Sequence, residues 1–305
     1  MKVAITGCTG MIGLSLINYH LKEGDEIIAL AHSGSSRISS IPNDPSVKII
    51  ECEMSDYWGL RGKEECDIFY HLAWAGTSGF DRDDAIIQSN NVGYSLDAVK
   101  LAASWGAKKF VGVGSQAEYG IVNIPMNENT PTHPISGYGI AKMAAGGLCR
   151  ILCKQMGLDF NWARVLSVYG ENDSKNSLIM YLIDTLLKGE SPVLTKCEQI
   201  WDYIYSDDCA CALACIALKG VDGRTYCIGN GVPTSLKDYV LSVRDSVDPD
   251  LEIVFGGREY YPHQPMYLCA DISDLKNDTG FLPKYLFKEG IERTIESECR
   301  RLFSQ

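Results

Sequence analysis

Three glycines placed directly after a short apolar strand constrain this chain more than any other feature. Residues Lys2–Thr6 read KVAIT, and Gly7, Gly10 and Gly13 follow in the spacing GxxGxxG before a helical segment begins. Glycines at this point permit a tight turn and a close approach of backbone N–H groups to a phosphate. The helix that follows directs the positive end of its dipole at that anion. The order of strand, glycine turn and helix therefore predicts a dinucleotide-binding βαβ unit.

The first half of the chain alternates between short apolar runs and helical patterns. The predicted strands are residues 2–6, 26–31, 47–52, 67–72, 109–113 and 160–165, and the predicted helices between them include residues 13–23, 86–105 and 140–156. Apolar strands that alternate with helices form a parallel sheet covered on both faces. With right-handed crossovers, this predicts an α/β fold with a doubly wound parallel sheet of the Rossmann type.

The alternation breaks after Tyr169, where the spacing of the elements becomes irregular. The predicted elements there are the strand 201–205 and the helices 177–188, 207–218, 236–246 and 289–303. A chain of 305 residues is long enough for two closely joined domains. We therefore expect a dinucleotide-binding domain of residues 1–168 plus about 197–230, and a smaller C-terminal substrate-binding cap domain of about 169–196 and 231–305.

The composition argues against several classes of partner and site. Lys and Arg number 28 and Asp and Glu number 39, and the resulting net charge of −11 disfavours nucleic acid or an anionic membrane as a partner. The 12 cysteines include no CxxC and no Cys/His pair of zinc spacing, so we expect reduced thiols and no metal site. No signal peptide precedes the first strand and no apolar run approaches the roughly 18 residues of a membrane span, which predicts a cytoplasmic protein.

The end of the second predicted strand bears on the choice of dinucleotide. Proteins selective for NAD usually carry Asp or Glu there to bind the ribose 2′-hydroxyl, but this segment reads AHSGSSR and ends at Arg37. Ser36 and Arg37 offer a hydroxyl and a guanidinium to a 2′-phosphate. We therefore favour NADP(H) over NAD(H), with a solvated loop charge as the alternative reading of Arg37. Glu53, just past the third strand, is placed to accept a hydrogen bond from the adenine amino group, or is a surface acid.

A serine, a tyrosine and a lysine supply the candidate catalytic groups. Ser115 follows the fifth predicted strand, at the edge where open α/β sheets bind their ligands. Tyr138 and Lys142 form a YxxxK pair at a helix start, and this spacing places both on one helix face. A neighbouring ammonium stabilises phenolate and lowers the pKa of a tyrosine from its usual value of about 10. This chemistry suits the proton transfer that accompanies hydride transfer at a carbinol or a ketone.

Motifs along nearly the whole chain resemble the NAD-dependent epimerase/dehydratase family, a group of extended short-chain dehydrogenases/reductases that contains UDP-galactose 4-epimerase. The matching segments are TGCTGMIG, YHLA at residues 70–73, NNVGYS with Asn91, the three catalytic candidates, RVLSVYG at 164–170, DYIYSDD at 202–208 and ADISDL at 270–275. The resemblance implies a nucleotide-diphosphate sugar as substrate, a role in nucleotide-sugar metabolism and polysaccharide biosynthesis, and a homodimer formed through a four-helix bundle. It also implies that Asn91 braces the active site.

The motifs and the resemblance together give a set of candidate cofactor-binding residues. They are Gly7, Thr9, Gly10, Met11, Ile12, Gly13, Ser36, Arg37, Glu53, Met54, Leu72, Ala73, Asn91 and Leu166.

Four further positions are candidates for substrate binding, and all four depart from the family pattern, Gln116 by replacing the small residue that is frequent there. Ser167 stands where many members have Asn, while Trp201 and a position near Tyr261 stand where members often have Arg for the substrate diphosphate. Gln116 follows the candidate catalytic serine. It is placed to recognise a hydroxyl or amide group of the sugar, or it forms part of the pocket wall. Other cations therefore bind the substrate diphosphate, or stacking and hydrogen bonds hold the nucleotide instead. A third alternative is that the substrate is not a standard UDP-sugar. The cations in question are Lys175, Lys196 and Arg258.

The resemblance and its departures favour an enzyme acting at C4 of a nucleotide-activated sugar. The missing acid after strand two favours a 4-keto-sugar reductase, and a 4-epimerase with tightly bound NAD is the alternative. A 4,6-dehydratase would carry an Asp-Glu pair after the serine, where this chain has Gln116 and Ala117, with Glu118 displaced by one position. A non-catalytic NADP-binding sensor on the same fold is the alternative from another class.

Overall fold

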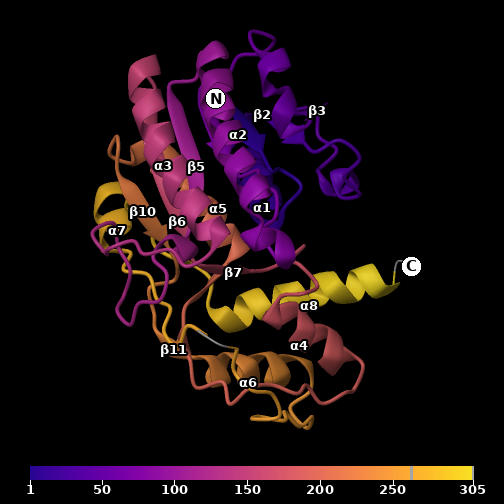
Figure 1. Cartoon of the computed structure of the whole chain (residues 1–305). Helices are drawn as coiled ribbons and strands as arrows, with labels where there is room; N and C mark the ends of the chain where they lie inside the picture. Colours follow the sequence, from indigo (N-terminus) through magenta and orange to yellow (C-terminus); the bar gives the residue numbers. More distant parts are fainter. Residues whose placement is uncertain (262–263, 304–305) are drawn as a thin grey trace.

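A seven-stranded parallel sheet forms the centre of the computed structural model, which describes residues 1–261 and 264–303 (Figure 1). The strand order is β10-β6-β5-β4-β1-β2-β3. The strands are β1 (Lys2–Thr6), β2 (Glu26–Ala31), β3 (Val47–Glu51), β4 (Ile68–His71), β5 (Lys109–Ser115), β6 (Asp159–Val165) and β10 (Thr225–Ile228). The chain winds outward in one direction from β1 and in the other from β4, so the order reverses between these two strands. This confirms the predicted doubly wound fold.

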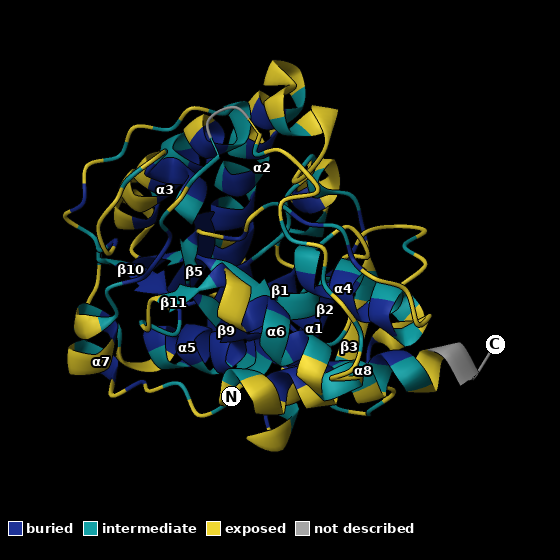
Figure 2. Ribbon diagram, turned by 90° about the horizontal axis from the view of Figure 1, so that it is seen from below, coloured by how far each residue is buried: buried dark blue, intermediate teal, exposed yellow. Residues whose placement is uncertain are grey.

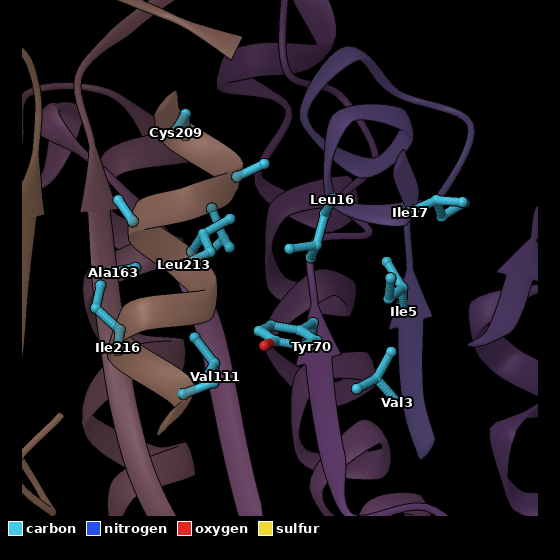
Figure 3. Close-up of a cluster of buried hydrophobic side chains, with 14 of the residues drawn as sticks. Val3, Ile5, Leu16, Ile17, Tyr70, Val111, Ala163, Cys209, Leu213 and Ile216 are labelled. Atoms are coloured by element: carbon cyan, nitrogen blue, oxygen red, sulfur yellow. The ribbon is translucent and has the colours of Figure 1, made fainter. Parts of the chain in front are cut away.

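Helices cover both faces of the sheet because alternate strand residues point to opposite sides. Val3 and Ile5 of β1 belong to a hydrophobic cluster with α1 (Met11–Lys22) and α5 (Ser206–Lys219), part of which Figure 3 shows. Ala4 faces the other way, into a cluster with α2 (Ala85–Ser104) and α3 (Gly137–Met156). Burial of each large apolar side chain contributes about 1.5–3 kcal/mol, so both helix pairs are held firmly to the sheet.

A third hydrophobic cluster holds together three helices that lie below the sheet in the view of Figure 1, beneath the carboxyl ends of its strands. It joins α4 (Leu178–Leu187), α6 (Leu236–Val247) and α8 (Phe287–Phe303), which contribute Ile183, Val240 and Ile291 among others. Short strand pairs connect this part to the sheet: β7 (Ser167–Tyr169) with β9 (Tyr203–Tyr205), and β8 (Ile200–Trp201) with β11 (Thr234–Ser235). Figure 2 shows buried residues on the inner sides of these helices and exposed residues on their outer sides.

Two elements of the sheet region were not predicted from the sequence, namely the edge strand β10 and the helix α7 (Ser273–Thr279). Leu275 of α7 and the following Phe281 are buried in the cluster that also contains α1 and α5. Arg224 fastens this region by pairing with carboxylates of Asp274 and Asp278. Part of the C-terminal segment that was expected in the cap domain, around α7, therefore packs on the sheet instead. The predicted domain boundaries stay a prediction.

Three further observations concern the cysteines, membrane spans and metal sites. All 12 cysteines are free, and most of them are buried. Within residues 1–261 and 264–303, no helix is both long enough and apolar enough to cross a membrane. The same described residues contain no cluster of three or more His, Cys, Asp or Glu side chains arranged to hold a metal ion.

Candidate active site

The glycine turn after β1 leaves no room for side chains and faces the point where the strand order reverses. Gly7 has φ +67°, and a Cβ atom on it would lie 2.7 Å from the backbone nitrogen of Ala73. A Cβ atom on Gly13 would lie 2.4 Å from the carbonyl oxygen of Gly7. In the described chain, α1 begins after Gly10 with no side-chain cap and no acid in its first turn. Its N-terminal N–H groups are thus free for an anion, so this turn fits a dinucleotide pyrophosphate.

Two pockets meet at this turn and form one groove along the carboxyl edge of the sheet. The outer pocket, of about 370 Å³, extends toward the ends of β2 and β3. The inner pocket, of about 360 Å³, extends toward β5 and α3. Gly7, Gly10, Leu72 and Trp74 line both pockets. A long ligand can therefore cross the turn with one end in each pocket, as a dinucleotide requires.

The three catalytic candidates come together in the inner pocket. Ser115 is the last residue of β5, and Tyr138 and Lys142 lie in the first turns of α3, which Ser136 caps by accepting from the Gly139 backbone. All three line the same pocket, and the Ser115 hydroxyl acts to lower the pKa of Tyr138. The Lys142 ammonium Nζ donates to the carbonyl oxygen of Val113 at 2.7 Å, which fixes the lysine against the sheet.

Burial sets the ionisation of the tyrosine and the lysine. Burial lowers the pKa of Lys142 to about 7, with the negative charge of Glu118 opposing that shift. Burial raises the pKa of Tyr138, while the hydrogen bond from Ser115 and the positive charge of Arg82 oppose that rise. The phenol is therefore held protonated, as an acid, until further positive charge enters the pocket.

Two residues beside Tyr138 were not predicted from the sequence. The Arg82 guanidinium lies 4.3 Å from the centre of the Tyr138 ring, and its Nη1 donates to the carbonyl oxygen of Thr77. The Lys142 ammonium lies 3.8 Å from the centre of the Trp74 ring, a cation–π contact in the pocket wall. Trp74 directly follows the YHLA motif, so its position could have been inferred, whereas no sequence signal marks Arg82.

The remaining cofactor candidates divide into residues that line the groove and residues that do not. Ser36 and Arg37 are exposed and are not among the described residues that line either pocket, and Arg37 donates to the carbonyl oxygen of Asn172 at 3.3 Å. A carboxylate oxygen of Glu53 lies 3.1 Å from Nε2 of His32, a residue that lines the outer pocket. The candidates in the pocket walls are Gly7, Thr9, Gly10, Met54, Leu72 and Ala73 in the outer pocket, and Met11, Ile12, Gly13 and Leu166 in the inner one.

Asn91 braces the loop after β4 rather than lining the groove. Its side-chain oxygen accepts from the backbone nitrogen of Ala75 at 3.0 Å, and its amide donates to the carbonyl oxygen of the same residue at 2.9 Å. Ala75 follows Trp74 in the chain and lines the outer pocket. The contact of Asn91 is therefore with the backbone of the pocket wall.

The substrate candidates occupy different surroundings. Trp201 donates from its indole nitrogen to the Ser167 hydroxyl at 2.8 Å, so two of the four candidates touch each other. Gln116 lies in the short turn after the catalytic serine, and Tyr261 is 77% exposed.

The three cations considered for the substrate diphosphate also differ. The Lys175 ammonium is already paired with Asp184 and Glu298, so its charge is neutralised within the protein. Arg258 lies over the ring of Tyr181, and Lys196 is exposed.

Glu118 points away from the pocket. Its carboxylate accepts from the Ser115 backbone nitrogen and the Trp162 indole at 2.9 Å each, and from Arg164 Nε at 2.7 Å. A carboxylate held in this way is not available to a substrate for acid–base elimination. The observation agrees with the sequence-based argument against a 4,6-dehydratase.

Comparisons with known proteins place this geometry in a family. The model of the NAD dependent epimerase/dehydratase family matches residues 3–229. A dTDP-glucose 4,6-dehydratase of Escherichia coli is 25% identical, with 97% of this chain and 92% of the relative covered. A UDP-glucose 4-epimerase of Mycolicibacterium smegmatis is 22% identical, with 97% and 98% covered.

Solved structures show the same fold over nearly the whole chain. A UDP-N-acetylglucosamine 4-epimerase from Methanobrevibacter ruminantium, in complex with UDP-N-acetylmuramic acid, has a TM-score of 0.89 at 23% identity, and 98% of each chain is covered. A UDP-glucose 4-epimerase from Thermotoga maritima with UDP-glucose has a TM-score of 0.85 at 21% identity, with 99% of this chain and 100% of the other covered. Because the family model spans well over half of the sequence, the chain belongs to the NAD-dependent epimerase/dehydratase family, whose members are enzymes of the extended short-chain dehydrogenase/reductase type.

Proposed function

We propose that this protein is a nucleotide-sugar 4-epimerase, an enzyme that removes and returns hydride at C4 of a sugar joined to a nucleoside diphosphate. The observation that carries the proposal is the grouping of Ser115, Tyr138 and Lys142 around one pocket at the end of the dinucleotide groove. The carboxylate of Glu118 is engaged behind that pocket, which disfavours elimination of water. Similar structures that are UDP-sugar 4-epimerases support the same choice.

Each of the three catalytic side chains has a separate role at the reacting oxygen. A bound nicotinamide dinucleotide would accept and return the hydride, and the glycine turn with the N-terminus of α1 would hold its pyrophosphate. Tyr138 takes the proton from the sugar 4-hydroxyl and gives it back. Lys142 lies on the same face of α3 and stabilises the phenolate that this transfer creates. The Ser115 hydroxyl donates to the reacting oxygen and holds it beside Tyr138.

A 4-keto-sugar reductase is the second candidate, favoured by the residues at the end of β2. His32 stands where an acid would bind the ribose hydroxyl of NAD, and Arg37 follows within the same loop. A reductase uses NADPH once per turnover and needs no tightly held cofactor. The active-site groups are the same for both reactions, so only the products separate them.

The test is mass spectrometry of products from a panel of UDP-, dTDP-, GDP- and CDP-sugars and their 4-keto forms. An isomer of unchanged mass, formed without added reductant, supports the epimerase. A gain of two hydrogens that depends on NADPH supports the reductase instead. Loss of one water would contradict both candidates, and no conversion of any compound would favour the sensor alternative.

Cofactor choice gives a separate prediction. This prediction belongs to the reductase, because the epimerase is expected to hold NAD. For a reductase, we propose that apo-protein binds NADPH more tightly than NADH and that Arg37→Ala removes the difference, weakening NADPH binding roughly tenfold or more because a charge-assisted contact is lost. Fluorescence titration with both cofactors measures this, with Arg61→Ala as control, since Arg61 stacks on the surface residue Trp58. A preference for NADH that Arg37→Ala leaves unchanged would overturn the proposal.

We also propose that the protein forms a homodimer through α2 and α3. Ile140, Leu148 and Ile151 of α3 are 52%, 44% and 55% exposed, and their spacing places them on one side of the helix. Leu148→Asp together with Ile151→Asp is expected to convert a dimer into a monomer, as measured by light scattering after size exclusion. The control is Leu218→Asp, which places the same charge at an exposed leucine of α5. A dimer that survives the double substitution would place the interface elsewhere.

A further inference from the structure

The short turn η4 (Gln116–Glu118) immediately after β5 determines how the catalytic serine is presented. The Ser115 hydroxyl oxygen accepts from the Ala117 backbone nitrogen at 3.2 Å, while the Ser115 backbone nitrogen donates to the Glu118 carboxylate at 2.9 Å. Together these contacts form a capping box, which closes the turn from both ends. Because the serine oxygen already accepts from the turn, its hydrogen is left to donate toward Tyr138 and the reacting oxygen.

Glu118 is fixed from several directions beneath that turn. The side chain is buried, and its partners besides the Ser115 backbone are the indole of Trp162 and the guanidinium of Arg164. The packing is tight: a Cβ atom on Gly114 would lie 2.3 Å from a Glu118 carboxylate oxygen. These donors hold the buried carboxylate in one orientation.

The charge of Glu118 acts on both proton-handling residues. Lys142 is surrounded by Glu118 from η4, Cys149 from α3 and His71 from β4. Of these groups, Glu118 has the largest effect in raising the pKa of Lys142 against burial. Tyr138 is faced by Ser115, Arg82 and Glu118, and Glu118 raises the pKa of that tyrosine as well.

We propose that Glu118 is a positioning residue of the active site, which presents the Ser115 hydroxyl as a hydrogen-bond donor and places a buried negative charge behind Lys142 and Tyr138. The inference rests on the proposed function for its kinetic consequence, because Ser115, Tyr138 and Lys142 carry the reaction. Glu118 itself touches neither groove pocket and acts through these neighbours.

The test replaces Glu118 with Gln and compares it with Glu128→Gln. Glu128 is a matched control because its carboxylate also accepts from one arginine Nε and one backbone nitrogen, those of Arg224 and Thr225. None of these three residues is among the described residues that line the inner pocket. We expect Glu118→Gln to lower kcat roughly 10- to 100-fold with little change in KM. Glu128→Gln is expected to leave kcat near the wild-type value.

The pH profile separates positioning from a general loss of structure. Without the carboxylate charge, neutral Lys142 and phenolate Tyr138 both become more favourable, so both pKa values fall. The acid limb of kcat, which reports Tyr138, and the alkaline limb, which reports Lys142, are therefore both expected to move to lower pH. Glu118→Asp keeps the charge but shortens the reach, so its kcat should fall while both limbs stay near their wild-type positions.

A second measurement does not depend on turnover. The ultraviolet absorbance of tyrosine phenolate is titrated in the full-length protein and in Glu118→Gln, each after subtraction of the matching Tyr138→Phe background. We expect Tyr138 to ionise at lower pH in Glu118→Gln. Unmoved limbs and an unmoved Tyr138 titration, with only a lower melting temperature, would overturn the inference. If the wild type converts no compound of the panel, the proposed function fails, and the phenolate titration still decides the role of Glu118.

Discussion

Tyr138→Phe is expected to reduce turnover by roughly 100- to 10,000-fold, because the substitution removes the hydroxyl that moves the proton and little else. Tyr138 lines the inner pocket together with Ser115, and its ring packs edge-on against Trp74 at 6.1 Å between centroids, a contact that phenylalanine retains. The measurement is kcat with the best nucleotide sugar of the panel. Cofactor affinity, followed by fluorescence titration, should stay within about twofold of the wild type.

Tyr19→Phe serves as the control for this prediction. Tyr19 lies toward the end of α1, outside both groove pockets among the described residues, and loses the same hydroxyl group. It should retain wild-type turnover. Turnover near the wild-type level in Tyr138→Phe would rule out the proposed role of that tyrosine in proton transfer.

Gly13→Ala is expected to weaken dinucleotide binding roughly a hundredfold, because the added methyl group has nowhere to go. Its Cβ atom would lie 2.4 Å from the carbonyl oxygen of Gly7 and 2.8 Å from the Cα atom of Cys8. Both neighbours are backbone atoms, so the whole turn must shift away from the N-terminus of α1. Isothermal titration with NADH and NADPH measures the loss.

The matched control for the glycine turn is Gly59→Ala, in the short helix η2 (Met54–Leu60). A Cβ atom there would meet no atom within 4 Å. That substitution should leave cofactor affinity unchanged, and equal affinities in the two variants would contradict the account of the turn. A melting curve for each variant separates weakened binding from lost stability, since a folded Gly13→Ala protein with weak binding is the expected result.

Strong local signals made much of the fold and of the catalytic site predictable from the sequence. Lys2–Thr6 and Glu26–Ala31 are apolar runs between glycines and polar residues, and the structure has both strands at the predicted bounds. Ser115, Tyr138 and Lys142 were identified from their place at a strand end and a helix start, and the structure brings all three to one pocket.

What the sequence did not reveal depends on contacts between distant segments. The strand β10 was missed because its four residues show no clear pattern of their own and gain their partner only by pairing with β6. Arg82 lies beside Tyr138 because η3 (Phe80–Asp83) packs on the start of α3, where Asp83 accepts from the Gly137 backbone at 2.7 Å. Likewise, the orientation of Glu118 followed from Trp162 and Arg164, more than 40 residues away in the chain.

β10 and α7 lie late in the sequence, and this position has a consequence for folding during synthesis on the ribosome. Tyr226, Leu275 and Phe281 belong to the same cluster as Val3 and Ile5, so that cluster stays incomplete until almost the whole chain has emerged. Contacts with such long sequence separation form slowly. We therefore expect the nascent N-terminal half to depend on chaperones, and cofactor capture to follow release of the finished chain rather than accompany its translation.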